Sequence, residues 1–231
     1  MLTKFVKSIS TPIELTEIVE EAPDTYTFKF AVPEKIRWSP GTYAHFLSSS
    51  LSNGEKVKKE LVRELSIMSH PDEDFIGFTT RIRENASTFK RIMLNMKAGD
   101  QIRMFKMGNH FAKANLAEPV VFISMGVGIA TFRPLILEHV NNTSARFPVT
   151  NINIDRTGHF VYQSFLETLP ENKVKNVLVT NRTDLYKSID VSIANRSKTF
   201  CVVGSDEFNK NIGDYLLRKK VPKKSIIFDK H

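Results

Sequence analysis

The sequence lacks the residues that several classes of protein require. It has 231 residues but a single cysteine, Cys201, which excludes a disulfide within these residues and any cysteine-ligated zinc or iron–sulfur site. Cys201 lies in the apolar run 200–203, so we expect a buried, inert thiol. There is no run of 18 apolar residues and no apolar core of a signal peptide, so we expect a cytoplasmic protein with no membrane span.

Acidic residues are outnumbered by basic ones. Lys and Arg number 33 and Asp and Glu number 25, which gives a formal net charge of +8. Basic proteins often bind nucleic acid, but these positive charges are scattered, and no basic strand carries the interleaved aromatics that would stack on bases. We therefore expect no nucleic-acid partner. The charge indicates either solvated surfaces or a potential that attracts anionic ligands and partners.

The first half of the chain has the rhythm of a β-structure. Short segments of alternating polarity are separated by turns, which predicts a small antiparallel six-stranded β-barrel over residues 1–115. The polar segment 48–59, with Asn53-Gly54 at its tip, is expected to form a hairpin turn or a mobile loop. The expected strands are 13–19, 26–30, 43–47, 61–68, 75–83 and 101–106, with one helix over 87–96.

The second half changes to alternating strands and helices. This pattern predicts an α/β domain over residues 116–231, built on a parallel sheet with crossover helices. Pro119 stands near the expected boundary. The expected strands are 120–124, 149–155, 174–180, 199–204 and 225–228, and the expected helices are 131–140, 160–169 and 206–219.

A glycine-containing turn follows the first of these strands. The apolar run 120–123 stops at a small residue, Gly126 and Gly128 follow, and a periodic segment opens at Thr131. Glycines let a backbone approach a ligand closely, and the first helical turn has unpaired N–H groups. The pattern therefore indicates a seat for a phosphate or pyrophosphate. An ordinary strand-to-helix turn has the same pattern, so both interpretations stay open on these residues alone.

A second candidate site lies about 60 residues upstream, by count along the printed sequence. Leu65 and Ile67 alternate with polar positions, as in a strand with one buried face. Arg63 and Ser66 then point to opposite faces, so one ligand meets both only through a bend or along the strand edge. A long ligand with a phosphate at one end and a hydrogen-bonding ring at the other fits. A solvated charge and an ordinary polar strand position are the alternatives.

The order of these segments resembles the ferredoxin–NADP reductase-like flavoproteins. That family has an Arg-x-Tyr-Ser/Thr flavin motif in its first domain and a Gly-x-Gly-Ile-Thr-Pro nicotinamide-nucleotide motif in its second. The resemblance covers most of the chain and implies an FAD-binding β-barrel domain over 1–115 and an NAD(P)-binding α/β domain over 116–231. The matching segments, in the expected order, are 40–43, 63–66, 98–102, 108–111, 126–131 and 203–208.

The resemblance also implies which residues hold the flavin. Arg63 would bind the flavin phosphate, and Ser66 would place its hydroxyl beside flavin N5. Leu65 stands where the family has the tyrosine that stacks on the ring, so Leu65 and Ser66 are the candidate catalytic positions. Two phosphate-holding segments favour FAD over FMN, although a purely capping role for Ser87 is also open. The remaining candidates along the flavin are Ile67, Thr80, Arg81, Ile82, Ser87 and Thr88.

The nucleotide site is implied in the same way. Gly126, Val127 and Gly128 would meet the pyrophosphate, with Thr131 as a helix cap. Gly204 and Ser205 would form a turn against the nicotinamide. Departures from the family pattern are Met125 in place of a glycine and Val203 in place of a cysteine. Arg156 and Arg182 are candidates for a 2′-phosphate, which favours NADPH over NADH, or are solvated strand-end charges. Asp229 and His231 stand near the family's C-terminal Glu and aromatic residue.

The implied activity is hydride transfer from NAD(P)H to FAD. Electrons would then pass to a separate acceptor, either an acidic ferredoxin- or flavodoxin-like carrier protein or a small molecule. No metal site is expected. The alternatives are a free-flavin or ferric reductase, and a non-catalytic regulatory module in which Leu65, Met125 and Val203 reflect lost turnover.

Overall fold

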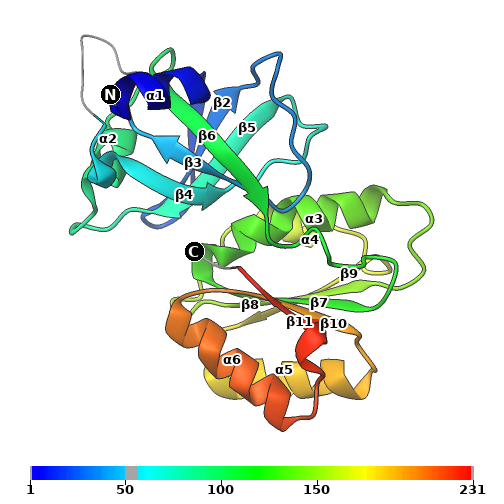
Figure 1. Ribbon diagram of the computed structural model, residues 1–231. Helices are drawn as coiled ribbons and strands as arrows, with labels where there is room; N and C mark the ends of the chain where they lie inside the picture. The colour runs from blue at the N-terminus through cyan, green and yellow to red at the C-terminus, as the bar shows by residue number, and fades with distance from the viewer. Residues whose placement is uncertain (1, 50–56, 230–231) are drawn as a thin grey trace. The chain divides into compact units, whose positions relative to one another are not determined.

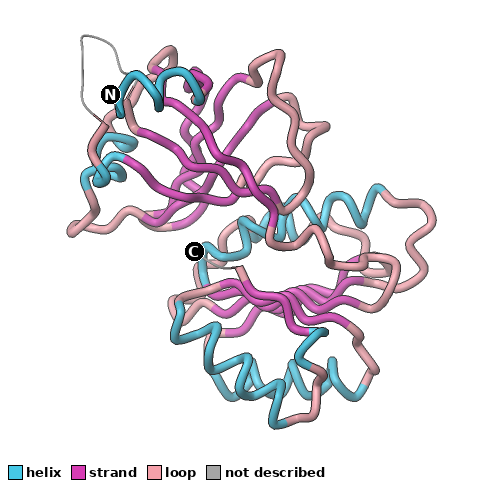
Figure 2. Tube along the Cα trace, in the orientation of Figure 1, coloured by secondary structure: helices cyan, strands magenta, loops and turns pink. Residues whose placement is uncertain are grey.

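The computed structural model describes residues 2–49 and 57–229, which divide after Asn109 into two compact units. Each unit contains one β-sheet (Figures 1 and 2). The boundary expected after residue 115 lies a few residues further along the chain. Most of the loop expected over 48–59, including Asn53-Gly54, lies outside the described residues.

The N-terminal unit is a curled antiparallel sheet of six strands, as predicted. The strand order is β4-β3-β6-β1-β2-β5. The Met68 N–H donates to the Gly77 carbonyl at 2.8 Å and so links the chain just after β4 to β5, the two edge strands. The sheet thereby turns toward a barrel. The strands are β1 (Thr11–Ala22), β2 (Thr25–Ala31), β3 (Thr42–Leu47), β4 (Val62–Ser66), β5 (Phe75–Arg81) and β6 (Gln101–Asn109).

Phenylalanine rings fill the inside of this sheet. Phe78 lies at the centre, with ring centroids 4.7 Å from Phe46 and 5.4 Å from Phe28. Helix α2 (Thr88–Leu94) adds Phe89 and Met93, both fully buried. Each such side chain stabilises the fold by about 1.5–3 kcal/mol relative to its exposed state. This core fixes the strands and the helix that carry the candidate flavin residues.

Helix α1 (Leu2–Ile9), which the sequence analysis did not predict, packs on the outside of the sheet. Val6 lies in a small apolar cluster with Leu47 and Phe105. The buried Arg103 donates to the Ser10 carbonyl at 2.6 Å and to the Lys7 carbonyl at 3.1 Å. These bonds satisfy carbonyl groups at the helix C-terminus that have no partner within the helix.

The C-terminal unit is a parallel sheet of five strands in the order β11-β10-β7-β8-β9, again as predicted. The central strands β7 and β10 are buried on both faces, which explains their nearly continuous apolar runs, whereas the neighbouring β8 buries two asparagines, Asn151 and Asn153. Helices α3 and α4 cover one face, and α5 and α6 cover the other (Figure 1). The elements are β7 (Val120–Met125), α3 (Ile129–Asn141), β8 (Val149–Ile154), α4 (Gln163–Glu167), β9 (Val174–Val179), α5 (Arg182–Ala194), β10 (Thr199–Val203), α6 (Asp206–Arg218) and β11 (Ile226–Phe228).

Two helices of this unit differ from expectation. Helix α5 was not predicted, although Asn181 caps it by accepting a hydrogen bond from the Asp184 N–H at 2.9 Å. Helix α3 begins at Ile129, because the short 3₁₀ turn η3 (Gly126–Gly128) leads directly into it. Thr131 is therefore an interior helical residue that is 4% exposed, and its predicted role as a helix cap is wrong.

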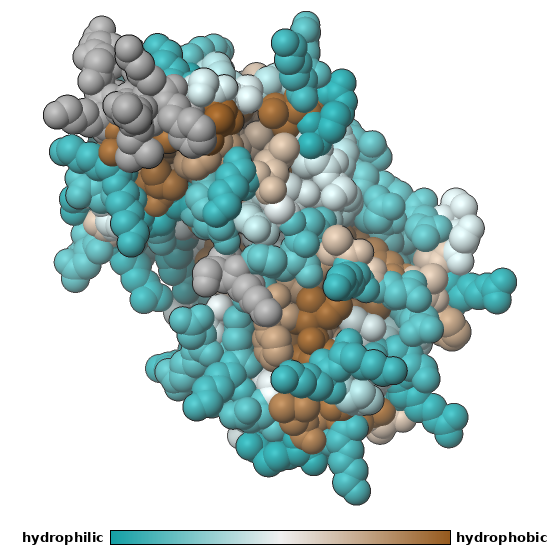
Figure 3. Space-filling view, viewed as in Figure 1, coloured by the Kyte–Doolittle hydropathy of each residue, from teal (hydrophilic) through white to brown (hydrophobic). Residues whose placement is uncertain are grey.

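No helix within the described ranges is long and apolar enough to cross a lipid bilayer. Polar residues cover most of the visible face of each unit, and apolar patches are interspersed among them (Figure 3).

Candidate functional site

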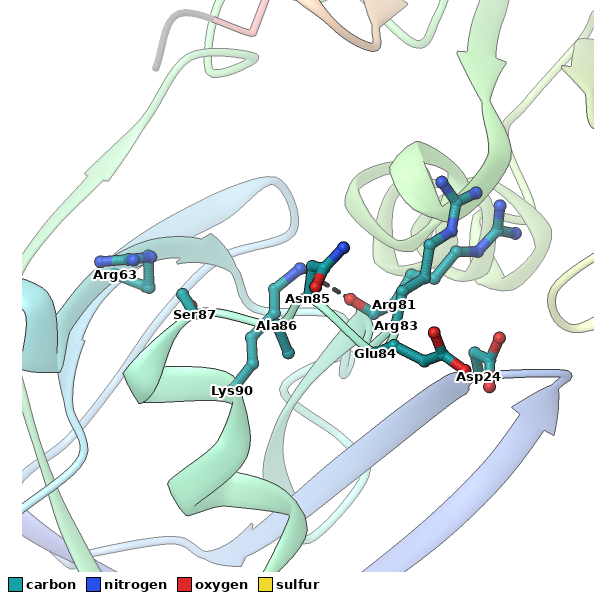
Figure 4. A pocket seen from close by; sticks show the side chains of 9 residues that line it. All are labelled: Asp24, Arg63, Arg81, Arg83, Glu84, Asn85, Ala86, Ser87 and Lys90. Carbon is teal, nitrogen blue, oxygen red and sulfur yellow. Dashed lines mark hydrogen bonds between the residues drawn. The ribbon is translucent and has the colours of Figure 1, made fainter.

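A cationic pocket of about 1000 Å³ lies in the N-terminal unit. Figure 4 shows Arg63 at one end of it and the carboxylates of Asp24 and Glu84 at the other. Arg81 and Arg83 extend side by side from the end of β5. The two carboxylates lie on the same side of the pocket as Arg81 and Arg83, whereas no acidic side chain among the described residues lines the part near α2, where Arg63 and Lys90 lie. The lining residues are Asp24, Arg63, Arg81, Arg83, Glu84, Asn85, Ala86, Ser87 and Lys90.

Strand β4 places its candidates on two faces, as the alternation predicted. Arg63 and Leu65 pair with Phe46 and Ala44 of β3, whose side chains are fully buried in the core. Ser66 pairs with Tyr43 and lies on the opposite face. Leu65 packs against the core cluster, and half-buried Arg63 reaches the pocket.

Ile67 and β5 supply mainly core residues. Ile67, Thr80 and Ile82 are 1%, 4% and 6% exposed, so their side chains belong to the interior rather than to the pocket. Arg81 does line the pocket, and its Nε donates to the Thr25 hydroxyl at 3.1 Å. Arg83 is the last residue of the strand expected over 75–83; it lies beside Arg81 in the pocket, and the sequence alone did not identify it as a site residue.

Two residues of the α2 region line the pocket, Ser87 and Lys90. Ser87 occupies the N-cap position, but its hydroxyl makes no capping bond. That oxygen is buried, and among the described residues it has no hydrogen-bond partner. Lys90, also missed in the sequence, donates to the Arg81 carbonyl at 2.7 Å. Thr88 is half-buried, and its hydroxyl lies 3.4 Å from the Arg91 guanidinium rather than in the pocket lining.

The charge of Lys90 is unfavourable in this setting. Burial lowers its pKa, and repulsion from Arg63, Arg83 and Arg81 lowers it further. An anion in the pocket would reverse this effect, because a nearby opposite charge favours the ammonium form. The cluster therefore suits a phosphorylated ligand.

The glycine turn lies at the carboxyl end of β7 in the C-terminal unit. Gly126 has a φ of +55°, which favours glycine. A Cβ atom on Gly128 would lie 2.9 Å from the Val203 carbonyl oxygen and 3.0 Å from a Val203 methyl group. Only glycine fits there without displacement, so the turn packs directly against the end of β10. Val127, between the two glycines, is half-buried.

The remaining nucleotide candidates lie at the carboxyl ends of the neighbouring strands. In a parallel sheet these ends share one edge, which is where ligands of such sheets bind. Arg156 follows β8 and is exposed. Arg182 opens α5 and is also exposed, 3.9 Å from Glu207. Gly204 follows β10, and the Ser205 hydroxyl caps α6 by accepting from the Phe208 N–H at 3.2 Å.

Asp155, at the same edge, accepts hydrogen bonds within its own turn. It is 5% exposed and accepts from the Thr157 N–H at 3.0 Å and from the Thr157 hydroxyl at 2.7 Å. Its Oδ1 atom is therefore engaged within the turn, whereas Arg156 beside it is exposed to solvent.

His110 and Asp229 form a pair, of which the sequence analysis named only Asp229. Asp229 follows β11 and is 3% exposed at its side chain, and its Oδ1 lies 2.6 Å from His110 Nδ1. His231 lies outside the described residues. In the part of the chain that the structure describes, no cluster of three or more His, Cys, Asp or Glu side chains is arranged to hold a metal ion.

Comparison with known proteins gives matches only at the level of structure. No protein-family model matches the sequence, and no curated protein does. A ferredoxin NADP+ reductase from Neisseria gonorrhoeae with bound FAD and NADP is 17% identical; the match covers 95% of this chain and 98% of that chain, with a TM-score of 0.77. The chain has the ferredoxin–NADP reductase fold.

Two further structures with this fold support that statement. A mutant of the ferredoxin-NADP+ reductase from Plasmodium falciparum with 2'P-AMP is 15% identical, with 95% of this chain and 96% of that chain covered and a TM-score of 0.76. The CS-b5R domains of human Ncb5or in the NAD+ form are 15% identical, with 95% and 69% covered and a TM-score of 0.76. The fold expected from the family resemblance is confirmed. In this ferredoxin–NADP reductase fold, the cationic pocket belongs to the barrel unit and the glycine turn to the parallel-sheet unit.

Proposed function

We propose that the protein is an FAD-dependent NAD(P)H oxidoreductase. The observation that carries this proposal is the cationic pocket in the barrel unit, which contains a buried hydroxyl without a partner among the described residues. A glycine turn at the carboxyl edge of a parallel sheet accompanies it. The Neisseria gonorrhoeae protein, which has the same fold, was crystallised with FAD and NADP.

The pocket fits a flavin dinucleotide. Arg63, Lys90 and the Ser87 hydroxyl would hold the pyrophosphate, because guanidinium and ammonium groups form strong hydrogen bonds to phosphate oxygens. Two phosphate-holding segments line the pocket, β4 with Arg63 and the start of α2 with Ser87, which favours FAD over FMN. Asp24 and Glu84 line the same pocket and could accept hydrogen bonds from sugar hydroxyls. Leu65 and Ser66 would lie at the flavin ring.

The carboxyl edge of the parallel sheet fits a nicotinamide nucleotide. The backbone of Gly126, Val127 and Gly128 would approach the pyrophosphate, and Gly204 and Ser205 would lie near the nicotinamide. Arg156 and Arg182 would bind a 2′-phosphate. These features favour NADPH over NADH.

When bound, the flavin supplies the chemistry, accepting a hydride equivalent from the reduced nicotinamide and giving electrons to an acceptor. The residues of the chain position the two cofactors. Leu65 covers the ring by dispersion, without the aromatic stacking that a tyrosine would give. The Ser66 hydroxyl can donate a hydrogen bond to the ring. No acid–base pair is required for this reaction.

We propose that the acceptor is a separate, acidic carrier protein, because the chain's net charge of +8 would attract such a partner. Leu65 favours a second candidate, a free-flavin or ferric reductase, because weaker stacking lets flavin exchange more readily. The experiment loads the protein with FAD and follows the oxidation of NADPH, and in parallel of NADH, with an acidic ferredoxin, with free FMN and with ferric citrate. A fast, salt-sensitive rate with ferredoxin supports the first candidate, and faster turnover of FMN or ferric citrate supports the second. No turnover with any acceptor contradicts both and supports a regulatory module.

A further inference from the structure

The glycine turn rests on a buried side chain from the neighbouring strand. Asn153 of β8 pairs in register with Ser124 of β7 (Figure 1 shows the two strands adjacent), and both residues are 0% exposed. The Asn153 Nδ2 atom lies 2.8 Å from the Ser124 hydroxyl and 3.1 Å from the Gly126 carbonyl oxygen. Because a carbonyl oxygen only accepts hydrogen bonds, the atom facing it must be the amide nitrogen. Asn153 therefore donates to the first residue of the turn.

This contact fixes one peptide group. The Gly126 carbonyl also accepts from the Ile129 N–H, so two donors determine its direction. A planar trans peptide points its C=O and its N–H in opposite directions, and the described chain contains no cis peptide bond. With the Gly126 carbonyl held toward Asn153, the Val127 N–H must point away from it.

Stability alone does not explain an asparagine at this position. The Asn153 Oδ1 atom is buried and has no hydrogen-bond partner among residues 2–49 and 57–229. Burying an unsatisfied amide oxygen disfavours folding, whereas an apolar side chain of the same shape would avoid that cost. What the asparagine provides is its amide nitrogen, which determines the direction of the Gly126 carbonyl in the turn.

We propose that Asn153 is a positioning residue, which presents the Val127 N–H to the pyrophosphate of NAD(P)H by holding the Gly126 carbonyl inward. The inference rests on the proposed function and extends it to a residue that does not itself touch the nucleotide. If the inference holds, loss of the Asn153 amide nitrogen raises the dissociation constant of the nucleotide by more than loss of a comparable buried amide away from the turn does.

Asn151 offers a matched control. It lies two positions earlier on β8, so its side chain is on the same face of the sheet. It is also 0% exposed, its Oδ1 is likewise buried without a described partner, and its Nδ2 makes a 2.9 Å bond to Asn176. That bond does not involve the turn. Asn153→Leu and Asn151→Leu thus remove comparable buried amides of similar shape, and only the first releases the Gly126 carbonyl.

The experiment measures equilibrium binding of NADP+ and NAD+ to the FAD-loaded protein by titration calorimetry, together with the melting temperature of each variant. Asn153→Leu is expected to raise the dissociation constant of the preferred nucleotide at least tenfold, and Asn151→Leu to change it less than twofold. Anaerobic stopped-flow reduction should show the same increase in the apparent dissociation constant, with a smaller change in the limiting rate. Asn153→Ser, whose short side chain cannot reach the carbonyl, is expected to behave like Asn153→Leu and serves if the leucine variant does not fold.

Equal nucleotide affinity in the Asn153 variants and the wild type would overturn the inference, as would an equal loss in Asn151→Leu. If wild-type protein with bound FAD binds neither NADP+ nor NAD+, the proposed function fails first, and this inference fails with it. The wild-type titration therefore separates the two failures.

Discussion

Replacing Lys90 by methionine is expected to change the apoprotein and the flavin-bound protein in opposite directions. In the apoprotein the Lys90 ammonium is partly buried, and burial and the three neighbouring arginines lower its pKa from the usual 10.5. Methionine keeps the length and the apolar stem of the side chain and removes the charge. The free energy of unfolding of the apoprotein should therefore rise, even though the bond to the Arg81 carbonyl is lost.

Flavin binding should weaken in the same variant. A hydrogen bond from a charged donor contributes about 1.5–3 kcal/mol, and about 1.4 kcal/mol corresponds to a tenfold change in a dissociation constant. The dissociation constant for FAD is therefore expected to rise about tenfold or more. Fluorescence titration of deflavinated protein with FAD measures the affinity, and urea unfolding of the apoprotein measures the stability.

The control is Lys97→Met, in the exposed segment that follows the same helix. Lys97 does not line the pocket, so removal of its charge should leave both quantities nearly unchanged. The pH dependence gives an independent check. Between the lowered pKa of Lys90 and 10.5, the unfolded chain binds more protons than the folded chain, so the stability of wild-type apoprotein should rise with pH toward that of Lys90→Met. An apoprotein destabilised by Lys90→Met, or unchanged FAD affinity, would refute the reasoning.

Three further predictions follow from the second unit. Gly128→Ala should lower the free energy of unfolding by about 1–3 kcal/mol in urea denaturation, because its Cβ would lie 2.9 Å from the Val203 carbonyl; an unchanged midpoint would show that the turn can move freely. Arg182→Gln should raise the KM for NADPH about tenfold, because a charge-assisted hydrogen bond is lost, and should leave the KM for NADH unchanged. Equal changes in the two KM values would contradict a 2′-phosphate site. Cys201 is fully buried, and burial raises its pKa to about 12, so the native protein should not react with a thiol reagent that titrates the unfolded chain, and rapid native labelling would show that β10 opens.

The strands were predictable because their signal is local. Phe28 and Phe30 alternate with polar residues, and the sheet buries both rings completely. The glycine turn was predictable for a similar reason, because glycine readily adopts the positive φ that a tight turn needs, and two glycines directly after an apolar run mark the end of the strand. The helix start was not. Gly128 adopts a helical φ of −58°, so the helix begins before the residue whose hydroxyl suggested a cap.

The pocket could be predicted only in part because its charge comes from distant segments. Arg63 was found through a motif, but Arg83 and Lys90 become pocket residues only when β5 and α2 fold against β4. The His110–Asp229 pair joins residues that are 119 positions apart. No local sequence pattern around either residue indicates that the other lies beside it. Asn153 was missed because an asparagine inside a β-strand looks like an ordinary polar position until its neighbour on β7 is known.

The central claim is that this chain holds a flavin that a nicotinamide nucleotide reduces. Anaerobic titration of the FAD-loaded protein with NADPH, and in parallel with NADH, tests it most directly, with the visible flavin absorption as the readout. The account predicts bleaching that is complete after about one equivalent of nucleotide, since one hydride carries two electrons, with NADPH acting at the lower concentration. Bound flavin that remains oxidised in the presence of both nucleotides would contradict it.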